Sequence, residues 1–203
     1  MGFLTVKPHT FAMPQLSDFT LYHRAVRDMR GDELLPLNRL RDVHPDIYER
    51  EAEKYAGREQ LRREKVLALD CQWGDVLFFS PVHPAQLLDT VREGGREVPP
   101  VRFWALNAAK LEPQQACIKF VRPWPGGAYT PPTPADYLSY TPEHLALVCQ
   151  PSEMTLTRLQ ALPPDSPLIL WMDVPHVLYR IPRPPRSIPP ATRTILEPQA
   201  FIL

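Results

Sequence analysis

Short apolar runs bounded by proline, glycine and polar residues recur along the chain. Runs of four to eight residues that are rich in β-branched and aromatic side chains are typical of β-strands. The first is Phe19-Thr20-Leu21-Tyr22-His23. The pattern predicts strands over residues 19–23, 75–79, 101–105, 116–121, 145–149, 168–172 and 177–181.

Other stretches show a helical pattern. Residues 46–64 (DIYEREAEKYAGREQLRRE) have one narrow apolar face, and Pro45 suits the first turn of a helix. Gly57 is expected to split this segment into two helices. Pro84 and the Gly94-Gly95 pair bound a further helix over residues 85–93. Residues 153–162 predict a short helix, residues near 135–137 at most one more, and residues 31–41 a turn and an irregular segment.

The order of these elements predicts the fold class. Strands alternate with helices, but the connections lack the regular helices of ten to fifteen residues that βαβ units use. We therefore expect an α+β protein with a mixed, mostly antiparallel sheet and flanking helices. Residues 1–181 form the predicted single domain. Residues 182–203 carry six prolines and predict an extended arm, which docks on the body or on a protein partner through residues 200–203, or is a frayed tail.

Composition narrows the function classes. Net charge is zero, which argues against a protein that coats duplex DNA through bulk electrostatics but leaves room for a local basic groove. The 3 cysteines form no CxxC pair, so neither a zinc knuckle nor a disulfide framework is supported. The longest apolar run, residues 168–172, is too short to span a bilayer. We expect a cytoplasmic protein without a membrane partner.

Several catalytic motifs are missing from the sequence. There is no GxxxxGK[ST], no GxGxxG after a strand, no HExxH and no GxSxG. The 6 histidines never pair at ligand spacing, so we expect no metal. Taken alone, these absences leave a binding protein as open as an enzyme.

An ordered series of segments points further. Tyr22-His23 ends the first strand, Gln60-Leu61-Arg62-Arg63 closes the charged segment, and Asp75-Val76-Leu77-Phe78-Phe79-Ser80-Pro81 follows. Then come Asn107-Ala108-Ala109 and Glu143-His144-Leu145-Ala146-Leu147-Val148. Over roughly residues 19–162 this order resembles the DarT family, toxins that ADP-ribosylate bases in single-stranded DNA.

The resemblance implies an ADP-ribosyltransferase-like fold and an NAD-dependent glycosyltransferase that acts on nucleic acid, in a toxin–antitoxin setting. NAD is the implied substrate. Its cleavage passes through an oxocarbenium-like state, which a carboxylate can stabilise while Arg pairs with the diphosphate. The implied catalytic residues are Glu143, Arg62 and Arg63. The implied NAD-binding residues are His23, Tyr22, Phe79 and Ser80, and Asn107 would contact the target base.

Each of these residues also has a plain structural interpretation. Glu143 could begin a helix, His23 could be a core histidine, and Arg62 and Arg63 could be solvated. Tyr22 and Phe79 could be core aromatics, and Asn107 could cap a turn. Two other functions therefore stay open. One is a non-catalytic module that stacks single-stranded nucleic acid on the aromatics around Trp104 and Trp124, and the other is an interaction protein that uses the proline-rich arm.

Overall fold

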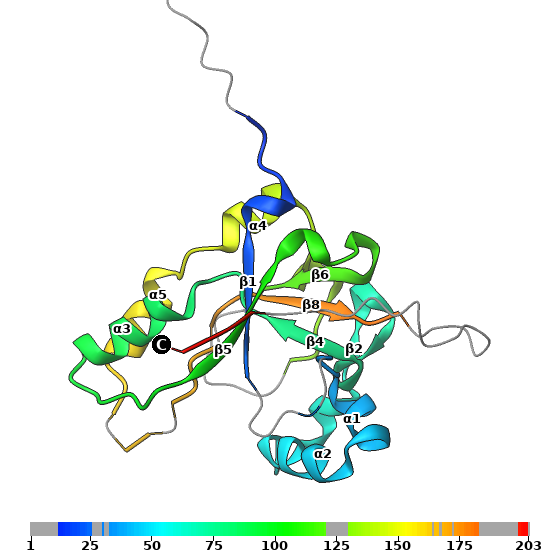
Figure 1. Ribbon diagram of the computed structural model, residues 1–203, viewed down its shortest axis with the longest axis horizontal. Helices are drawn as coiled ribbons and strands as arrows, with labels where there is room; N and C mark the ends of the chain where they lie inside the picture. Colours follow the sequence, from blue (N-terminus) through cyan, green and yellow to red (C-terminus); the bar gives the residue numbers. More distant parts are fainter. Residues whose placement is uncertain are drawn as a thin grey trace, which may run out of the picture.

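The computed structural model describes residues 12–25, 30, 33–120, 130–163, 165–166, 168–171, 173–182 and 199–202 (Figure 1). The protein is an α+β protein, and every strand pairing in the described residues is antiparallel. The helices are α1 (Leu37–Val43), α2 (Pro45–Ala52), α3 (Pro84–Glu93), α4 (Pro142–Val148) and α5 (Glu153–Gln160). The strands are β1 (Thr20–Arg24), β2 (Lys65–Val66), β3 (Cys71–Gln72), β4 (Val76–Phe79), β5 (Arg102–Asn107), β6 (Ala116–Lys119), β7 (Tyr137–Ser139), β8 (His176–Arg180) and β9 (Gln199–Ile202).

The strands form two main sheets and a small hairpin. The first sheet has the order β1-β5-β9, the second has the order β4-β8-β6-β7, and β2 pairs with β3. Figure 1 shows the strands of the two sheets running across one another, with α3 and α5 together on one side and α1 and α2 near one end of β1.

Alternation along the strands builds a layered core, because successive side chains of a strand point to opposite faces of its sheet. On β4, Leu77 and Phe79 pack between the two sheets, whereas Val76 packs on the opposite face beneath the β2–β3 hairpin. On β5, Leu106 joins the core between the sheets and Phe103 packs with α3 and α5 on the other face. The two sheets therefore share one apolar layer, and each has a second layer on its outer face.

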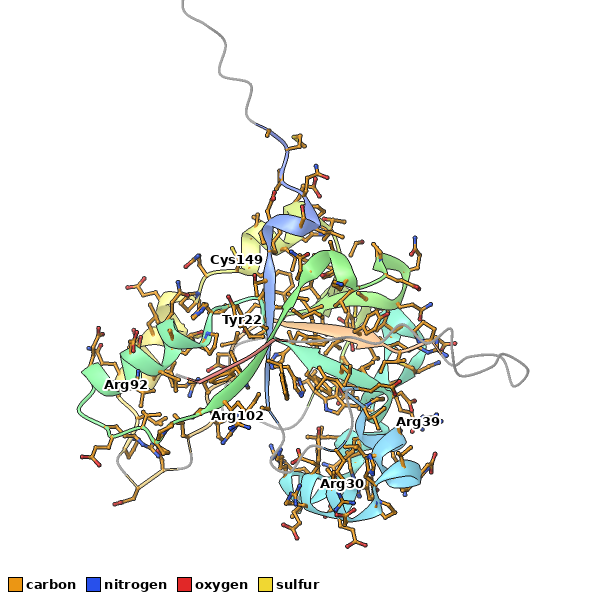
Figure 2. All side chains as sticks on the ribbon, viewed as in Figure 1. Tyr22, Arg30, Arg39, Arg92, Arg102 and Cys149 are labelled. Carbon is orange, nitrogen blue, oxygen red and sulfur yellow. The ribbon has the colours of Figure 1, made fainter. Side chains whose placement is uncertain are left out.

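A pair of backbone hydrogen bonds joins the sheets. The amide of Tyr22 donates to the carbonyl of Ser80 at 2.8 Å, and the amide of Ser80 donates to the carbonyl of Tyr22 at 2.7 Å. The two residues thus form an isolated antiparallel bridge between the middle of β1 and the end of β4. In Figure 2, Tyr22 lies where the two sheets cross.

Most of the predicted strands and helices are confirmed. The structure has strands or helices where the sequence predicts them near residues 19–23, 75–79, 85–93, 101–105, 116–121, 153–162 and 177–181. Gly57 divides residues 46–64 as predicted and has φ +73°, but the second part, η3 (Glu59–Arg63), is a 3-10 helix. Residues 31–41 were expected to be irregular, yet α1 begins at Leu37.

Two predicted strands are wrong. Residues 145–148 instead form the second half of α4, and residue 149 is its C-cap, because Pro142 occupies the first turn and the Thr141 hydroxyl caps the helix by accepting from the His144 amide at 3.3 Å. Leu145 and Val148, three residues apart, are buried, while Leu147 is 74% exposed, which is a helical rather than an alternating pattern. Residues 168–171 form a turn with Leu170 buried, and Met172 lies outside the described residues.

The last described strand comes from the predicted C-terminal arm. Gln199–Ile202 pair with β5 in the register Arg102↔Ile202 to Ala105↔Gln199. The arm's residues 183–198 and 203 lie outside the described part of the chain. The backbone of its end therefore adds an edge strand to the first sheet.

A side-chain hydrogen bond links helix α1 to the turn directly before β4. The Asn38 amide donates to the Asp75 carboxylate at 2.9 Å, and the same carboxylate accepts from the Gln72 amide at 3.0 Å. Asn38 fits here because Gly74 has no Cβ, and a Cβ at that position would lie 2.6 Å from the Asn38 Oδ1.

Replacing this amide should loosen α1. We expect Asn38→Ala to lower the free energy of unfolding by about 1–2 kcal/mol, because Asp75 loses a part-buried donor. Urea denaturation checks the value, with the exposed neighbour Arg39→Ala as a control that changes it by less than about 0.5 kcal/mol. Equal stability of the two variants would show that the Asn38–Asp75 bond is not what holds α1.

Candidate functional site

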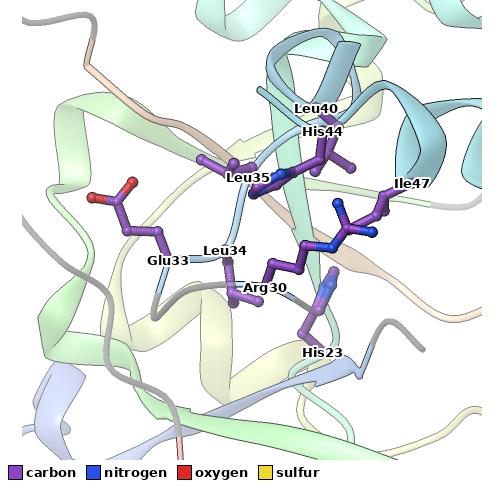
Figure 3. Close-up of a pocket in the computed structure, with 8 residues that line it drawn as sticks. All are labelled: His23, Arg30, Glu33, Leu34, Leu35, Leu40, His44 and Ile47. Carbon is purple, nitrogen blue, oxygen red and sulfur yellow. The ribbon is translucent and has the colours of Figure 1, made fainter. Parts of the chain in front are cut away.

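A cleft lies between the far end of β1 and the segment that carries α1 and α2. Its enclosed space is about 30 Å³, far below the roughly 300–1,000 Å³ of small-molecule sites. Figure 3 shows its lining side chains converging from β1, the segment before α1, and both helices. They are His23, Arg30, Glu33, Leu34, Leu35, Leu40, His44 and Ile47.

His23 is the polar group at the base of the cleft. Its Nδ1 lies 2.6 Å from the carbonyl oxygen of Phe78, and a carbonyl can only accept, so Nδ1–H is the donor. Burial lowers the pKa of His23, although the bond to Phe78 opposes this shift. The ring is therefore neutral at pH 7, and Nε2 keeps a lone pair that can accept a hydrogen bond.

Helix α2 forms the opposite wall. His44 precedes Pro45 at the start of the helix, and Ile47 is 2% exposed on the face that closes the cleft. The guanidinium of Arg30 donates to both carboxylate oxygens of Asp46, at 3.2 and 2.6 Å. In Figure 3 the Arg30 side chain extends across the cleft above the His23 ring. Arg30 thus ties the segment after β1 to the first turn of α2.

Three other residues that the resemblance assigns to NAD lie at or beside the Tyr22–Ser80 bridge between the two sheets. Tyr22 and Ser80 are joined through their backbones, and the Phe79 ring centroid lies 5.7 Å from that of His23. Phe79 is 1% exposed in the core between the sheets. The Ser80 hydroxyl donates to the Val82 carbonyl and accepts from the Val82 amide, so it closes the turn after β4.

The two arginines of η3 differ in setting. The Arg62 guanidinium donates to the Tyr48 hydroxyl at 3.1 Å, which holds it against α2 beside the cleft wall. Arg63 is exposed. Of the two arginines, Arg62 is therefore the one that contacts α2, the helix that forms one wall of the cleft.

Glu143 and Asn107 lie elsewhere. Asn107 is opposite Thr20 at the start of β1, and its side chain caps a turn by donating to the Ser17 carbonyl and accepting from the Ala109 amide, both at 2.9 Å. Glu143 is in the exposed first turn of α4, where its own backbone amide and the Thr141 hydroxyl lower its pKa. Figure 1 shows α4 at one end of β1 and α1 and α2 at the other. The predicted catalytic carboxylate and base-contacting amide are thus grouped together, away from the cleft.

The two tryptophans of the binding-module hypothesis can be placed only in part. Trp104 lies on β5 directly opposite His23 and packs, half-buried, against the core between the sheets. It therefore presents only part of its ring for stacking. Trp124 lies outside the described residues.

Sequence reasoning missed Arg30, Glu33 and His44, which line the cleft with His23. The signal available for the helix was Pro45, which marks its first turn directly after His44. The remaining contacts, such as the one between Arg30 and Asp46, form only in the folded protein, and the sequence carries no local signal for them.

Among the residues described here, no group of three or more His, Cys, Asp or Glu side chains is placed to hold a metal ion. The same residues contain no helix of the length and apolar character needed to cross a bilayer. The cleft offers the Nε2 acceptor of His23, the Arg30 guanidinium and the Glu33 side chain, beside apolar side chains such as Ile47.

Comparison with known proteins adds no relative. No family model matches the chain, and no curated protein or solved structure matches it either.

Two partly buried histidines, His23 and His176, contact Phe78, and both should make folding sensitive to acid. The centroid of the His176 ring lies 6.3 Å from that of Phe78, in an edge-to-face arrangement. Burial lowers the pKa of His176 to about 4, although its hydrogen bond to the Val174 carbonyl acts in the opposite direction. Between pH 6.5 and 4 the unfolded chain then binds more protons than the folded one. The contribution to stability is complete above pH 6.5 and is lost as the pH falls.

We expect the free energy of unfolding to fall by roughly 1 kcal/mol per pH unit below pH 6.5 for His176, with a further part from His23. Urea denaturation at pH 7.5, 6.5, 5.5 and 4.5 measures the slope. His176→Phe keeps a ring against Phe78 and should flatten the slope, whereas His144→Gln on α4 should leave it as in the wild type. An unchanged slope in His176→Phe would contradict this account.

Proposed function

We propose that this protein is an NAD-dependent ADP-ribosyltransferase with an ADP-ribosyltransferase-like fold. It binds NAD in the cleft at the end of β1, cleaves the nicotinamide–ribose bond and transfers ADP-ribose to a base of single-stranded nucleic acid. One observation carries the proposal: Tyr22 and His23 meet Phe79 and Ser80, from more than fifty residues away, at one junction beside a cleft.

The polarity of the cleft supports a nucleoside as ligand. Nε2 of His23 is an acceptor beside apolar Leu34, Leu40 and Ile47 side chains. A ribose hydroxyl donates to such an acceptor, while the apolar wall takes the flat ring of nicotinamide or adenine. The enclosed space of about 30 Å³ is smaller than a nucleoside, so the cleft must widen for NAD to enter.

The diphosphate would then lie outside the cleft, near Arg62. This guanidinium is held beside α2 by Tyr48, and a planar guanidinium can pair with phosphate oxygens through two parallel hydrogen bonds. Arg30 can contribute a second charge at the rim only in competition with Asp46, which it already binds through both oxygens.

A non-catalytic module that binds single-stranded nucleic acid is the second candidate. The observation that favours it is the position of Glu143 and Asn107 at the other end of β1 from the cleft. In that case affinity for oligonucleotides would fall with salt and would survive Glu143→Ala.

Binding of NAD through His23 can be measured directly. We expect His23→Gln to weaken NAD binding by about tenfold or more in isothermal titration calorimetry, because the Gln amide cannot both bond the Phe78 carbonyl and keep its oxygen at the position of Nε2. His144→Gln is the matched control, since its Nδ1 also bonds a backbone carbonyl, that of Ser139 at 2.8 Å, but on α4. Far-ultraviolet circular dichroism verifies that both variants are folded. Wild-type protein that shows no heat and no rise in melting temperature at millimolar NAD would refute the proposal.

The reaction itself is tested with NAD labelled in its adenylate part and a mixed pool of single-stranded DNA and RNA oligonucleotides. We expect label on an oligonucleotide with wild-type protein and far less with His23→Gln. NAD binding without any transfer or turnover would leave the binding module as the function.

A further inference from the structure

The outer edge of strand β5, on the side away from β1, requires a further strand. The amide of Ala25 donates to the carbonyl of Arg102 at 2.9 Å, so Arg102 and every second residue after it direct their backbone groups toward β1. The amides and carbonyls of Phe103 and Ala105 therefore face the outer edge. Phe103 is buried, and a sheet edge whose backbone groups are unpaired is a template for another strand.

Strand β9 fills this edge, and Figure 1 shows it in red alongside β5. Phe201 lies opposite Phe103, and Gln199 lies opposite Ala105. The backbone groups of these two β9 residues therefore face β5, whereas those of Ala200, between them, face the open side. The strand is held by backbone pairing, which any chain with the same C-terminal sequence can supply.

A long, proline-rich connection joins β9 to the body of the protein. Residues 183–198, sixteen in all, include five prolines, and one of them, Pro198, directly precedes β9. Chains of this composition are stiff and favour extended conformations, at about 3.1 Å per residue. Sixteen residues of such a chain reach about 50 Å.

The distance to be crossed within one chain is shorter than this reach. Strand β8 ends at Arg180, opposite Val76, which is four residues before Ser80 at the crossing of the sheets. Strand β9 begins at Gln199, two strands away from Tyr22 at the same crossing. With about 3.3 Å per residue and about 4.8 Å between strands, the two ends are at most about 30 Å apart. A stiff connection longer than the span disfavours closure within one chain.

A second copy of the chain meets the same requirements. Its C-terminal strand has the same sequence and takes the same register on β5, so the association needs no new contact. Two copies that exchange strands about a two-fold axis form the β5–β9 pairing twice. Because the first pairing brings the second pair of strands together, the two pairings strengthen one another.

We propose that two copies of this protein associate by exchanging their C-terminal strands, so that Gln199–Ile202 of each copy complete the first sheet of the other at the outer edge of β5. This association does not use the cleft and does not depend on the proposed function.

Cysteine cross-linking of the full-length protein distinguishes exchange from pairing within one chain. Arg102 and Ile202 are directly opposite one another, as a non-hydrogen-bonded pair with Cα atoms about 4.5 Å apart, which is within the range of a disulfide. Arg102→Cys and Ile202→Cys are produced together as two separate chains that carry tags of different size. We expect a disulfide-linked pair of unlike chains on a non-reducing gel.

The control for this cross-link keeps the same chains but shifts the register. Arg102→Cys is produced together with Ala200→Cys, which lies two residues from the position opposite Arg102 and is too distant for a disulfide. We expect no linked pair of unlike chains here. The native free cysteines are present in both experiments, so a cross-link through them would appear equally in both.

Sedimentation velocity over a range of protein concentrations measures the association itself. Gln199→Pro removes an amide that faces β5, whereas Ala200→Pro removes one that faces the open side, so the two variants are matched. We expect Gln199→Pro to raise the dissociation constant of the dimer by about tenfold or more, because each dimer loses this hydrogen bond twice. Ala200→Pro should change it by less than about threefold.

The outcomes decide between exchange and closure within one chain. An in-register cross-link between unlike chains, together with weaker association of Gln199→Pro, supports strand exchange. A double variant, Arg102→Cys with Ile202→Cys, that closes its disulfide within one chain while the unlike chains stay unlinked overturns it. Wild-type protein that sediments as a monomer at every concentration overturns it as well. A dimer without the in-register cross-link also overturns it, since the copies then meet through another surface.

Discussion

The backbone pairing of Tyr22 with Ser80 is the constraint on which the cleft depends. Two short reciprocal hydrogen bonds, of 2.8 and 2.7 Å, fix where β1 meets β4 and so set how the two sheets cross. Because β1 continues beyond this point, His23 projects past the junction and its ring reaches the Phe78 carbonyl. The Ser80 hydroxyl, closed onto Val82, turns the chain sharply toward α3. Without these two hydrogen bonds, neither the position of His23 nor the cleft beside it would be fixed.

Phe78 connects this junction to the outer layer. Its carbonyl accepts from His23, and its ring packs on His176 and, at 4.6 Å, on Trp73. Trp73 in turn lies beneath the Lys119 ammonium at 4.4 Å and donates to the Tyr55 hydroxyl. Both histidines are neutral because burial disfavours their charged forms. Through Phe78 and Trp73, these aromatic contacts connect His23 at the cleft to Tyr55 in η2 (Glu53–Tyr55).

The sequence predicts the strand at Val76–Phe79 well, because a continuous apolar run between turn residues suits a strand whose side chains point alternately into two apolar layers. It fails at Leu145–Val148, where a short apolar run fits strand and helix equally and the Thr141 cap decides. The site is harder still. His23 with Phe78 and Arg30 with Asp46 meet through tertiary packing, which the spacing of these residues along the chain does not reveal.

The order of segments along a chain does not settle which of them meet. Tyr22, His23, Phe79 and Ser80 come together, whereas Asn107 and Glu143 gather at the start of β1, where the Tyr140 hydroxyl donates to the Ala108 carbonyl at 2.8 Å. From Thr20 to His23 is three residues, or roughly 10 Å of strand. A single reacting bond cannot be contacted from both ends of that distance by short side chains. The predicted NAD-binding side chains of β1 and β4 are therefore separated along β1 from Asn107, whose side chain caps a turn there, and from Glu143.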